Sequence, residues 1–172
     1  LNLDVFRDKQ LPFDETRRPK MLQDMIKTLK HPIRVDSLLL VNSTISYTEQ
    51  PATGDAEGKI TFSGIHTRLT PFTNMKTTKG VIPDFTLTGT ATIMDSCQLN
   101  INMHYQMNHP ENLFTASGSL NRFNMRILNP VLEPLAMVSL RSGQVDRFDF
   151  SFSADKTSAT GQLYLGYDNL KI

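Results

Sequence analysis

The sequence of 172 residues contains no tryptophan and a single cysteine, Cys97. One cysteine cannot form a disulfide within the chain, so the fold must be held by packing and hydrogen bonds. The lone cysteine fits both a reducing cytosol and a bacterial periplasm. Long apolar runs are also missing: the longest, 38-LLLV-41, is far shorter than the roughly 20 residues of a membrane-spanning helix. No charged segment followed by an apolar one marks a signal peptide.

The chain also has no large excess of charge of either sign. The formal net charge is +1, which gives no electrostatic case for binding nucleic acid or an acidic membrane surface. The only dense basic cluster, 17-RRPK-20, is diluted by Asp14, Glu15 and Asp24 and is typical of a solvated face. We therefore expect no nucleic-acid partner.

Motifs for catalysis or metal binding are missing too. The four histidines, His31, His66, His104 and His109, have no H-x₃-H or H-E-x-x-H spacing. There is no G-x-S-x-G, P-loop or G-x-G-x-x-G motif. His104 could meet Cys97 across a hairpin as a Cys–His pair, although a turn cysteine and a surface histidine are the simpler interpretation. We expect no metal, no cofactor and no enzymatic activity. A hydrolase using the scattered carboxylates is a distant alternative.

What the chain does contain is a series of two-faced β-strands. In 85-FTLTGTATIM-94 the apolar positions alternate with threonines, and in 98-QLNINMHYQM-107 they alternate with polar residues. Residues 145–154 and 159–167 alternate in the same way. The large residues predicted to form one shared apolar face are Met107, Phe114, Leu120 and Tyr167, together with twelve that we predict to contact a ligand: Phe85, Leu87, Ile93, Leu99, Ile101, Met103, Tyr105, Phe148, Phe150, Phe152, Leu163 and Leu165.

The patterns predict a single, mainly β domain over residues 1–172 with two short helices. Residues 1–32 are expected to form a strand, an extended connector and a capping helix over 20–29, which begins after Pro19 and ends at His31-Pro32. Residues 33–172 are expected to form an antiparallel sheet with a second helix near 130–138. Both ends of the sequence look like the middle of a strand, so we expect a piece of a longer protein.

Two local features of the expected sheet are less regular. Leu39 and Val41 share a parity with Ile33 and Val35, and a tight turn is expected at Asn42-Ser43. Between residues 113 and 125 the apolar parity switches, because Phe114 and Leu120 lie on one face and Phe123 on the other. A bulge or sharp bend near Asn121-Arg122 would reconcile the two halves.

The apolar face is too large to remain in water. Each large side chain gains roughly 1.5–3 kcal/mol on burial, so the set as a whole gains some tens of kcal/mol. Two short helices cannot cover five long strands. Two arrangements follow: a closed β-sandwich or barrel whose core is this face, or long antiparallel strands in a curved, taco-like groove or open sandwich that is partly open. In the second, the helix over 20–29 is expected to plug one mouth of the groove.

A resemblance to a known family favours the groove. The chain contains, in order, I-x-V-D-S-L leading to I-S-Y-x-E (33–49), G-x-I-x-F-x-G-I (58–65), L-N-P-x-L-x-P (128–134), S-G-x-V-x-x-F-D-F (142–150) and A-x-G-x-L-x-L-x-Y-x-x-L-x-I (159–172). In this order the segments resemble the AsmA-like envelope proteins, the superfamily that includes the TamB and YhdP types, in the form common in Bacteroidetes. Residues 75–95 lie outside the resemblance.

The resemblance implies a function without catalysis. Members are anchored in the inner membrane of Gram-negative bacteria and extend through the periplasm as apolar β-grooves, and several are implicated in phospholipid transfer or outer-membrane biogenesis. It implies that the twelve apolar residues contact phospholipid acyl chains, and that envelope or outer-membrane proteins are partners. The alternative is a structural or protein-interaction scaffold with a closed β-sandwich core.

Overall fold

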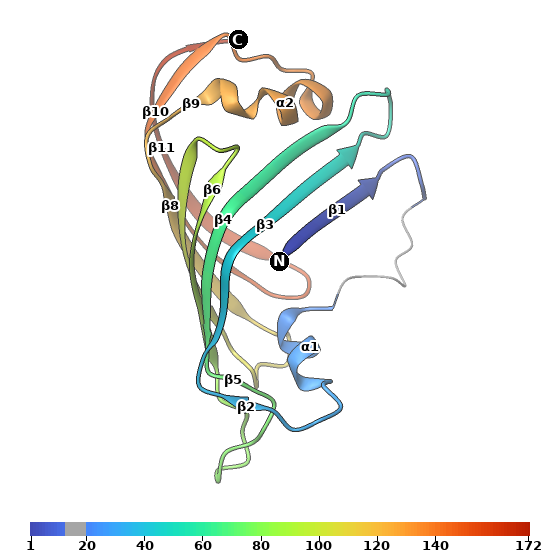
Figure 1. Cartoon of the computed structure of the whole chain (residues 1–172), viewed down its shortest axis with the longest axis vertical. Coiled ribbons are helices and arrows are strands. Elements are labelled where there is room, and N and C mark those ends of the chain that lie inside the picture. Colours follow the sequence, from blue (N-terminus) through green and yellow to red (C-terminus); the bar gives the residue numbers. More distant parts are fainter. Residues whose placement is uncertain (13–19) are drawn as a thin grey trace.

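The computed structural model describes residues 1–12 and 20–172 and is mainly β, with 55% strand and 11% helix (Figure 1). Much of the expected connector, together with Pro19 and the two arginines of the basic cluster, lies outside the described residues. The expected fold class is confirmed: the long strands form one large curved sheet that is not closed into a barrel. A closed sandwich is therefore not what these residues form.

Nine strands make up the main sheet, in the order β1-β3-β4-β6-β7-β8-β10-β11, with β9 beside β10. A separate pair of two-residue strands joins β2 to β5. The strand bounds are β1 Asn2–Asp8, β2 Arg34–Val35, β3 Leu38–Gln50, β4 Gly58–Thr70, β5 Phe72–Thr73, β6 Phe85–Ile93, β7 Cys97–Tyr105, β8 Phe114–Leu120, β9 Phe123–Asn124, β10 Ser142–Ala154 and β11 Ala159–Lys171.

One pairing differs from the expected antiparallel arrangement. Strand β1 runs parallel to β3, with Leu3 opposite Ile45 and Val5 opposite Tyr47. The chain leaves β1, passes through helix α1 (Leu22–Lys27) and returns to the end of the sheet from which β1 started, so both strands point the same way. All other neighbours in the main sheet are antiparallel, as the sequence predicted. Short turns join β6 to β7 and β10 to β11, whereas residues 71–84 separate β4 from β6 and residues 121–141, which include α2, separate β8 from β10.

The prediction of a tight turn at Asn42-Ser43 is wrong. Strand β3 continues through this point with a bulge, where Asn42 has φ of +49°. Its neighbour β4 has a bulge at the same level, where Gly64 has φ of +55°. A bulge bends its strand and increases the local twist, which accounts for the curve of β3 and β4 toward the helices (Figure 1). The bend expected at Asn121-Arg122 is confirmed, since it separates β8 from β9.

Both expected helices are present, with altered bounds. The first is only Leu22–Lys27, and the second, α2, covers Asn129–Ala136 after a 3-10 turn, η2, over Met125–Leu128. Both lie on the same side of the sheet (Figure 1). We call this the inner face, and the opposite side the outer face.

Two apolar clusters lie on the inner face, one near each helix. The first joins Ile26 of α1 to Leu69, Phe85, Tyr105 and Met107. The second is built around Val145, which is fully buried, and includes Ile93, Cys97 and Phe123, with partly buried residues of η2 packed against it. The core is therefore divided between the two ends of the sheet.

The first prediction concerns the attachment of α1. We expect Ile26→Ala to lower the free energy of unfolding by about 2–5 kcal/mol, because Ile26 is only 3% exposed and its loss leaves a cavity. Urea denaturation followed by circular dichroism measures this. Met25→Ala, on the exposed side of the same helix, is the matched control and should change the free energy by less than about 0.5 kcal/mol. Equal effects would show that α1 is not packed as described.

A second prediction concerns the parallel edge strand. Glu49 of β3 is buried, forms an ion pair with Lys9 just beyond β1, and accepts a hydrogen bond of 2.6 Å from the Tyr47 hydroxyl. The Lys9 ammonium, followed by the Tyr47 hydroxyl, lowers the pKa of the Glu49 carboxyl. A carboxylate of this kind stabilises the fold above its unfolded-state pKa, and that contribution is lost as the pH falls through its folded-state pKa.

We therefore expect the Glu49→Gln variant to be less stable than the natural chain at neutral pH. Its loss of stability between about pH 5 and about pH 3 should also be smaller, because one titrating carboxylate is missing. Thermal unfolding across this range measures both effects. An unchanged pH profile would show that the ion pair adds nothing to stability.

Candidate functional site

All twelve predicted residues lie on the inner face, because the strand register aligns them in rows. Along one row, Leu87 lies opposite Met103, Met103 opposite Ala116, and Ala116 opposite Phe152. In the adjacent rows Ile101 lies opposite Gly118, which faces Phe150 and then Leu163, while Leu99 leads through Leu120 to Phe148 and Leu165. The alternation within each strand thus becomes one apolar surface that crosses β6, β7, β8, β10 and β11.

Six aromatic rings connect the two ends of this surface. Their centroids follow each other at 4.5, 5.2, 6.0, 6.3 and 6.3 Å, in the order Phe85, Tyr105, Phe114, Phe152, Phe150 and Phe148. We call this series the aromatic path. It begins in the cluster under α1 and ends in the cluster near η2. Phe114 and Leu120 also belong to this surface. The alternation of residues 113–120 predicted both for the apolar face, although neither was among the twelve predicted to contact a ligand.

Helix α1 packs on one end of the inner face. The sequence predicted a helix over 20–29 that plugs one mouth of the groove. Besides the apolar contact through Ile26, Gln23 is fully buried and its Nε2 donates to the carbonyl oxygen of Asn112, 2.7 Å away, in the turn between β7 and β8. The Lys27 ammonium donates to Oδ1 of the same asparagine at 2.9 Å. Apolar and polar contacts together fix this helix to the sheet.

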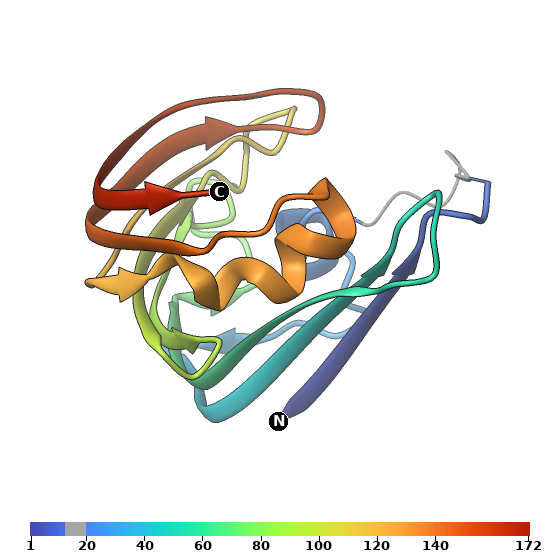
Figure 2. The ribbon, with the colours of Figure 1, turned by 90° about the horizontal axis from the view of Figure 1, so that it is seen from above.

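Helix α2 spans the opposite end, which the sequence did not predict. Viewed from above, it crosses from the side of β9 and β10 toward β3 and β4 (Figure 2). Leu135 of α2 packs directly on Gly58 at the start of β4, where an added Cβ would lie 2.5 Å from the leucine Cγ. The missing side chain at Gly58 therefore lets the helix rest against the far wall of the curved sheet.

Between the two helices the apolar face is only partly covered. Ile101 and Phe150 of the central row are half-buried, and Leu163, at the end of that row, is 60% exposed. None of these three residues belongs to either core cluster. In contrast, Phe85, Tyr105 and Ile93 are 2%, 7% and 9% exposed. A ligand could therefore contact Phe85, Tyr105 and Ile93 only if the residues that cover them moved. The central row is accessible without such a rearrangement.

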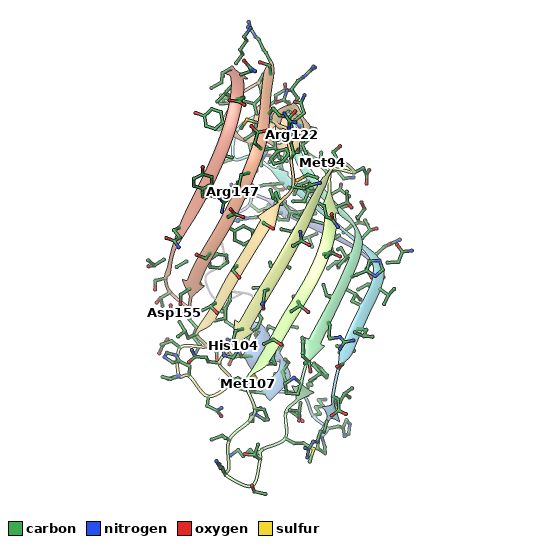
Figure 3. All side chains as sticks on the ribbon, turned by 90° about the vertical axis from the view of Figure 1, so that its left-hand side faces the viewer. Met94, His104, Met107, Arg122, Arg147 and Asp155 are labelled. Carbon is green, nitrogen blue, oxygen red and sulfur yellow. The ribbon has the colours of Figure 1, made fainter. Side chains whose placement is uncertain are left out.

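The outer face has different chemistry. Most of its side chains are polar (Figure 3), and the described residues form a shallow furrow of about 630 Å³ there, across β3, β4, β6, β7 and β8. Threonine, serine and asparagine side chains line most of the furrow, with Arg68 of β4 and the apolar Leu39 and Val41 of β3 at one side. His104 lies on this face, 3.7 Å from Asp84, while Cys97 is buried on the inner face. Since the two belong to opposite faces of β7, the Cys–His pair considered from the sequence does not form. Within residues 1–12 and 20–172, no cluster of histidine, cysteine, aspartate or glutamate could hold a metal ion.

Comparison with known proteins adds no identification. No family model matches the chain, and no similar curated protein or solved structure was found. Among the described helices, none has both the length and the apolar character needed to cross a membrane. The resemblance to AsmA-like proteins therefore rests on the sequence segments alone and stays a prediction.

A third prediction follows from the position of Cys97 in the second cluster. The residue is 1% exposed, and burial raises the pKa of its thiol. We expect the native protein to react very slowly with Ellman's reagent, because the reactive thiolate is disfavoured and the sulfur is out of reach. The same sample in denaturant should react at the rate of a free cysteine. Rapid reaction of the native protein would show that this end of the inner face opens to solvent.

Proposed function

We propose that this chain is a non-catalytic module that receives hydrocarbon chains of phospholipids on its inner face. In line with the sequence resemblance, the module belongs to an inner-membrane-anchored periplasmic protein of a Gram-negative bacterium that serves phospholipid transfer or outer-membrane biogenesis. The observation that carries the proposal is the apolar surface of an open sheet, which crosses five strands without a polar interruption among its rows and is incompletely covered between α1 and α2.

The chemistry of this surface suits a hydrocarbon ligand. Its central part presents Ile101, Phe150 and Leu163, and it offers no charged group to a headgroup. Each methylene group moved from water onto such a surface contributes about 0.8 kcal/mol, so contact along one acyl chain can support binding without any specific polar contact. Aromatic rings and a methionine, Met103, line the approach and adapt to flexible chains.

A protein scaffold is the second candidate. In that case the inner face would be occupied by a partner protein, and the polar outer face would remain in water. The closed sandwich that the sequence analysis linked with this role is not formed, so a scaffold would have to use the open sheet described above.

Purification under native conditions tests the lipid proposal. The protein should carry phospholipid that is seen by native mass spectrometry and recovered by solvent extraction. It should also bind a fluorescent fatty acid, such as cis-parinaric acid, which added phosphatidylethanolamine displaces. A protein that carries no lipid and binds no probe would contradict the proposal and favour the scaffold.

The fourth prediction uses a matched pair of variants to test which face of the sheet binds the probe. Ile101 and Asn102 are neighbours on β7 that point to the inner and outer faces, respectively. We expect Ile101→Glu to weaken probe binding by about tenfold or more, since a charge held against hydrocarbon costs more than the ~1.4 kcal/mol that corresponds to tenfold. Asn102→Glu should leave binding unchanged. Circular dichroism and the melting temperature of both variants establish that they are folded, and equal binding by both would contradict the assignment.

A further inference from the structure

Over residues 159–167 the edge strand β11 lacks the protection that edge strands normally have, and its irregular part around Asn169 (φ of +53°) lies beyond this run. Among residues 1–12 and 20–172, the strand is the last of the sheet and pairs only with β10. Over residues 159–167 it contains neither a charged residue nor a proline, and Leu163, Tyr164 and Tyr167 are 60%, 58% and 50% exposed. Soluble proteins usually place charges, proline or bulges on such a strand, because its unpaired backbone groups otherwise recruit another strand.

The opposite edge obeys this rule. Strand β1 places Asp4, Arg7 and Asp8 within its seven residues. The two edges therefore differ in charge: β1 has three charged residues among its seven, and residues 159–167 of β11 have none.

We propose that β11 pairs with β11 of a second copy of this chain, antiparallel and with Leu163 on the twofold axis. This register pairs the uncharged run with itself, because Leu163 is the midpoint of residues 159–167. Asp168 and Lys171 then fall outside the run. An isologous contact of this kind closes as a dimer and does not continue into a fibre.

Side-chain sizes fit the proposed register. On the face that carries Leu163, Leu165 lies opposite Gly161 and Tyr167 lies opposite Ala159, so the two large residues that follow Leu163 on this face each meet a small one. On the other face, Gln162 lies opposite Tyr164. Directly opposed side chains in antiparallel strands lie about 4.5–5.5 Å apart between their Cβ atoms, so such size matching decides whether two strands can approach.

Pairing with β1 of another copy fits less well. It would set Asp4, Arg7 and Asp8 beside a strand that offers no opposite charge over nine residues. The antiparallel β11 pair has a further property: a twofold axis perpendicular to the sheet keeps the inner faces of both copies on the same side. The two apolar faces then become continuous across the new interface. The interface itself does not depend on lipid binding.

Cysteine cross-linking tests the register directly. Leu163→Cys places two thiols opposite each other on the axis, and the natural Cys97 does not interfere because it is 1% exposed. With a short bis-maleimide reagent, we expect most of the Leu163→Cys protein to run as a covalent dimer on a denaturing gel. Leu3→Cys, at an exposed position of β1, is the matched control and should stay largely monomeric.

Sedimentation velocity of the natural chain should give the mass of two chains. Leu163→Lys should give the mass of one, with an unchanged circular dichroism spectrum, because two lysines would meet at the axis. A natural chain that sediments as one copy up to its solubility limit would overturn the proposal. Preferential cross-linking of Leu3→Cys would overturn it as well. Because none of these measurements involves lipid, they separate this interface from the proposed function.

Discussion

The structure depends on the register between neighbouring strands. Side chains alternate with a period of two, so a slip of one residue between β6 and β7 would turn Leu99, Ile101 and Met103 to the opposite face. The native register instead aligns them with Leu87 on one side and with Ala116 and Gly118 on the other. The apolar rows, the aromatic path and both core clusters all follow from this alignment. Burial of the apolar clusters at the two ends of the sheet in turn stabilises this register.

Much of this was readable from the sequence, and the errors have identifiable causes. The alternation in β7 and β10 predicted the inner face correctly, and the parity switch predicted the bend before Phe123. A turn was predicted at Asn42-Ser43 because asparagine with positive φ occurs both in turns and in bulges, and local residues cannot distinguish the two. Leu39 and Val41 were grouped by parity with Ile33 and Val35 as one face of a strand, and in the structure they lie on the outer face, 54% and 60% exposed. The parallel pairing of β1 and the crossing of α2 depend on contacts between distant segments, which no local pattern encodes.

The two helices cover the inner face by different means. Helix α2 depends on shape, since Leu135 fits where Gly58 has no side chain. Helix α1 has buried polar groups, and among the described residues Oε1 of Gln23 and Nδ2 of Asn112 are buried without a hydrogen-bond partner. An unsatisfied buried polar atom costs about 1–3 kcal/mol. The net stabilisation from docking α1 is therefore smaller than its apolar contacts alone suggest, and of the two covers it is the one whose opening would expose Phe85 and Tyr105.

The bulges in β3 and β4 constrain how this sequence can change over evolution. On the inner face, β3 uses even positions before its bulge (Leu38, Leu40) and odd positions after it (Ile45, Tyr47), and β4 changes phase at the same level, from Phe62 to Thr67 and Leu69. Removing one residue from either bulge would invert half of that strand relative to its neighbours. Insertions and deletions here are thus tolerated only as compensating pairs, so the lengths of two separate chain segments must evolve together.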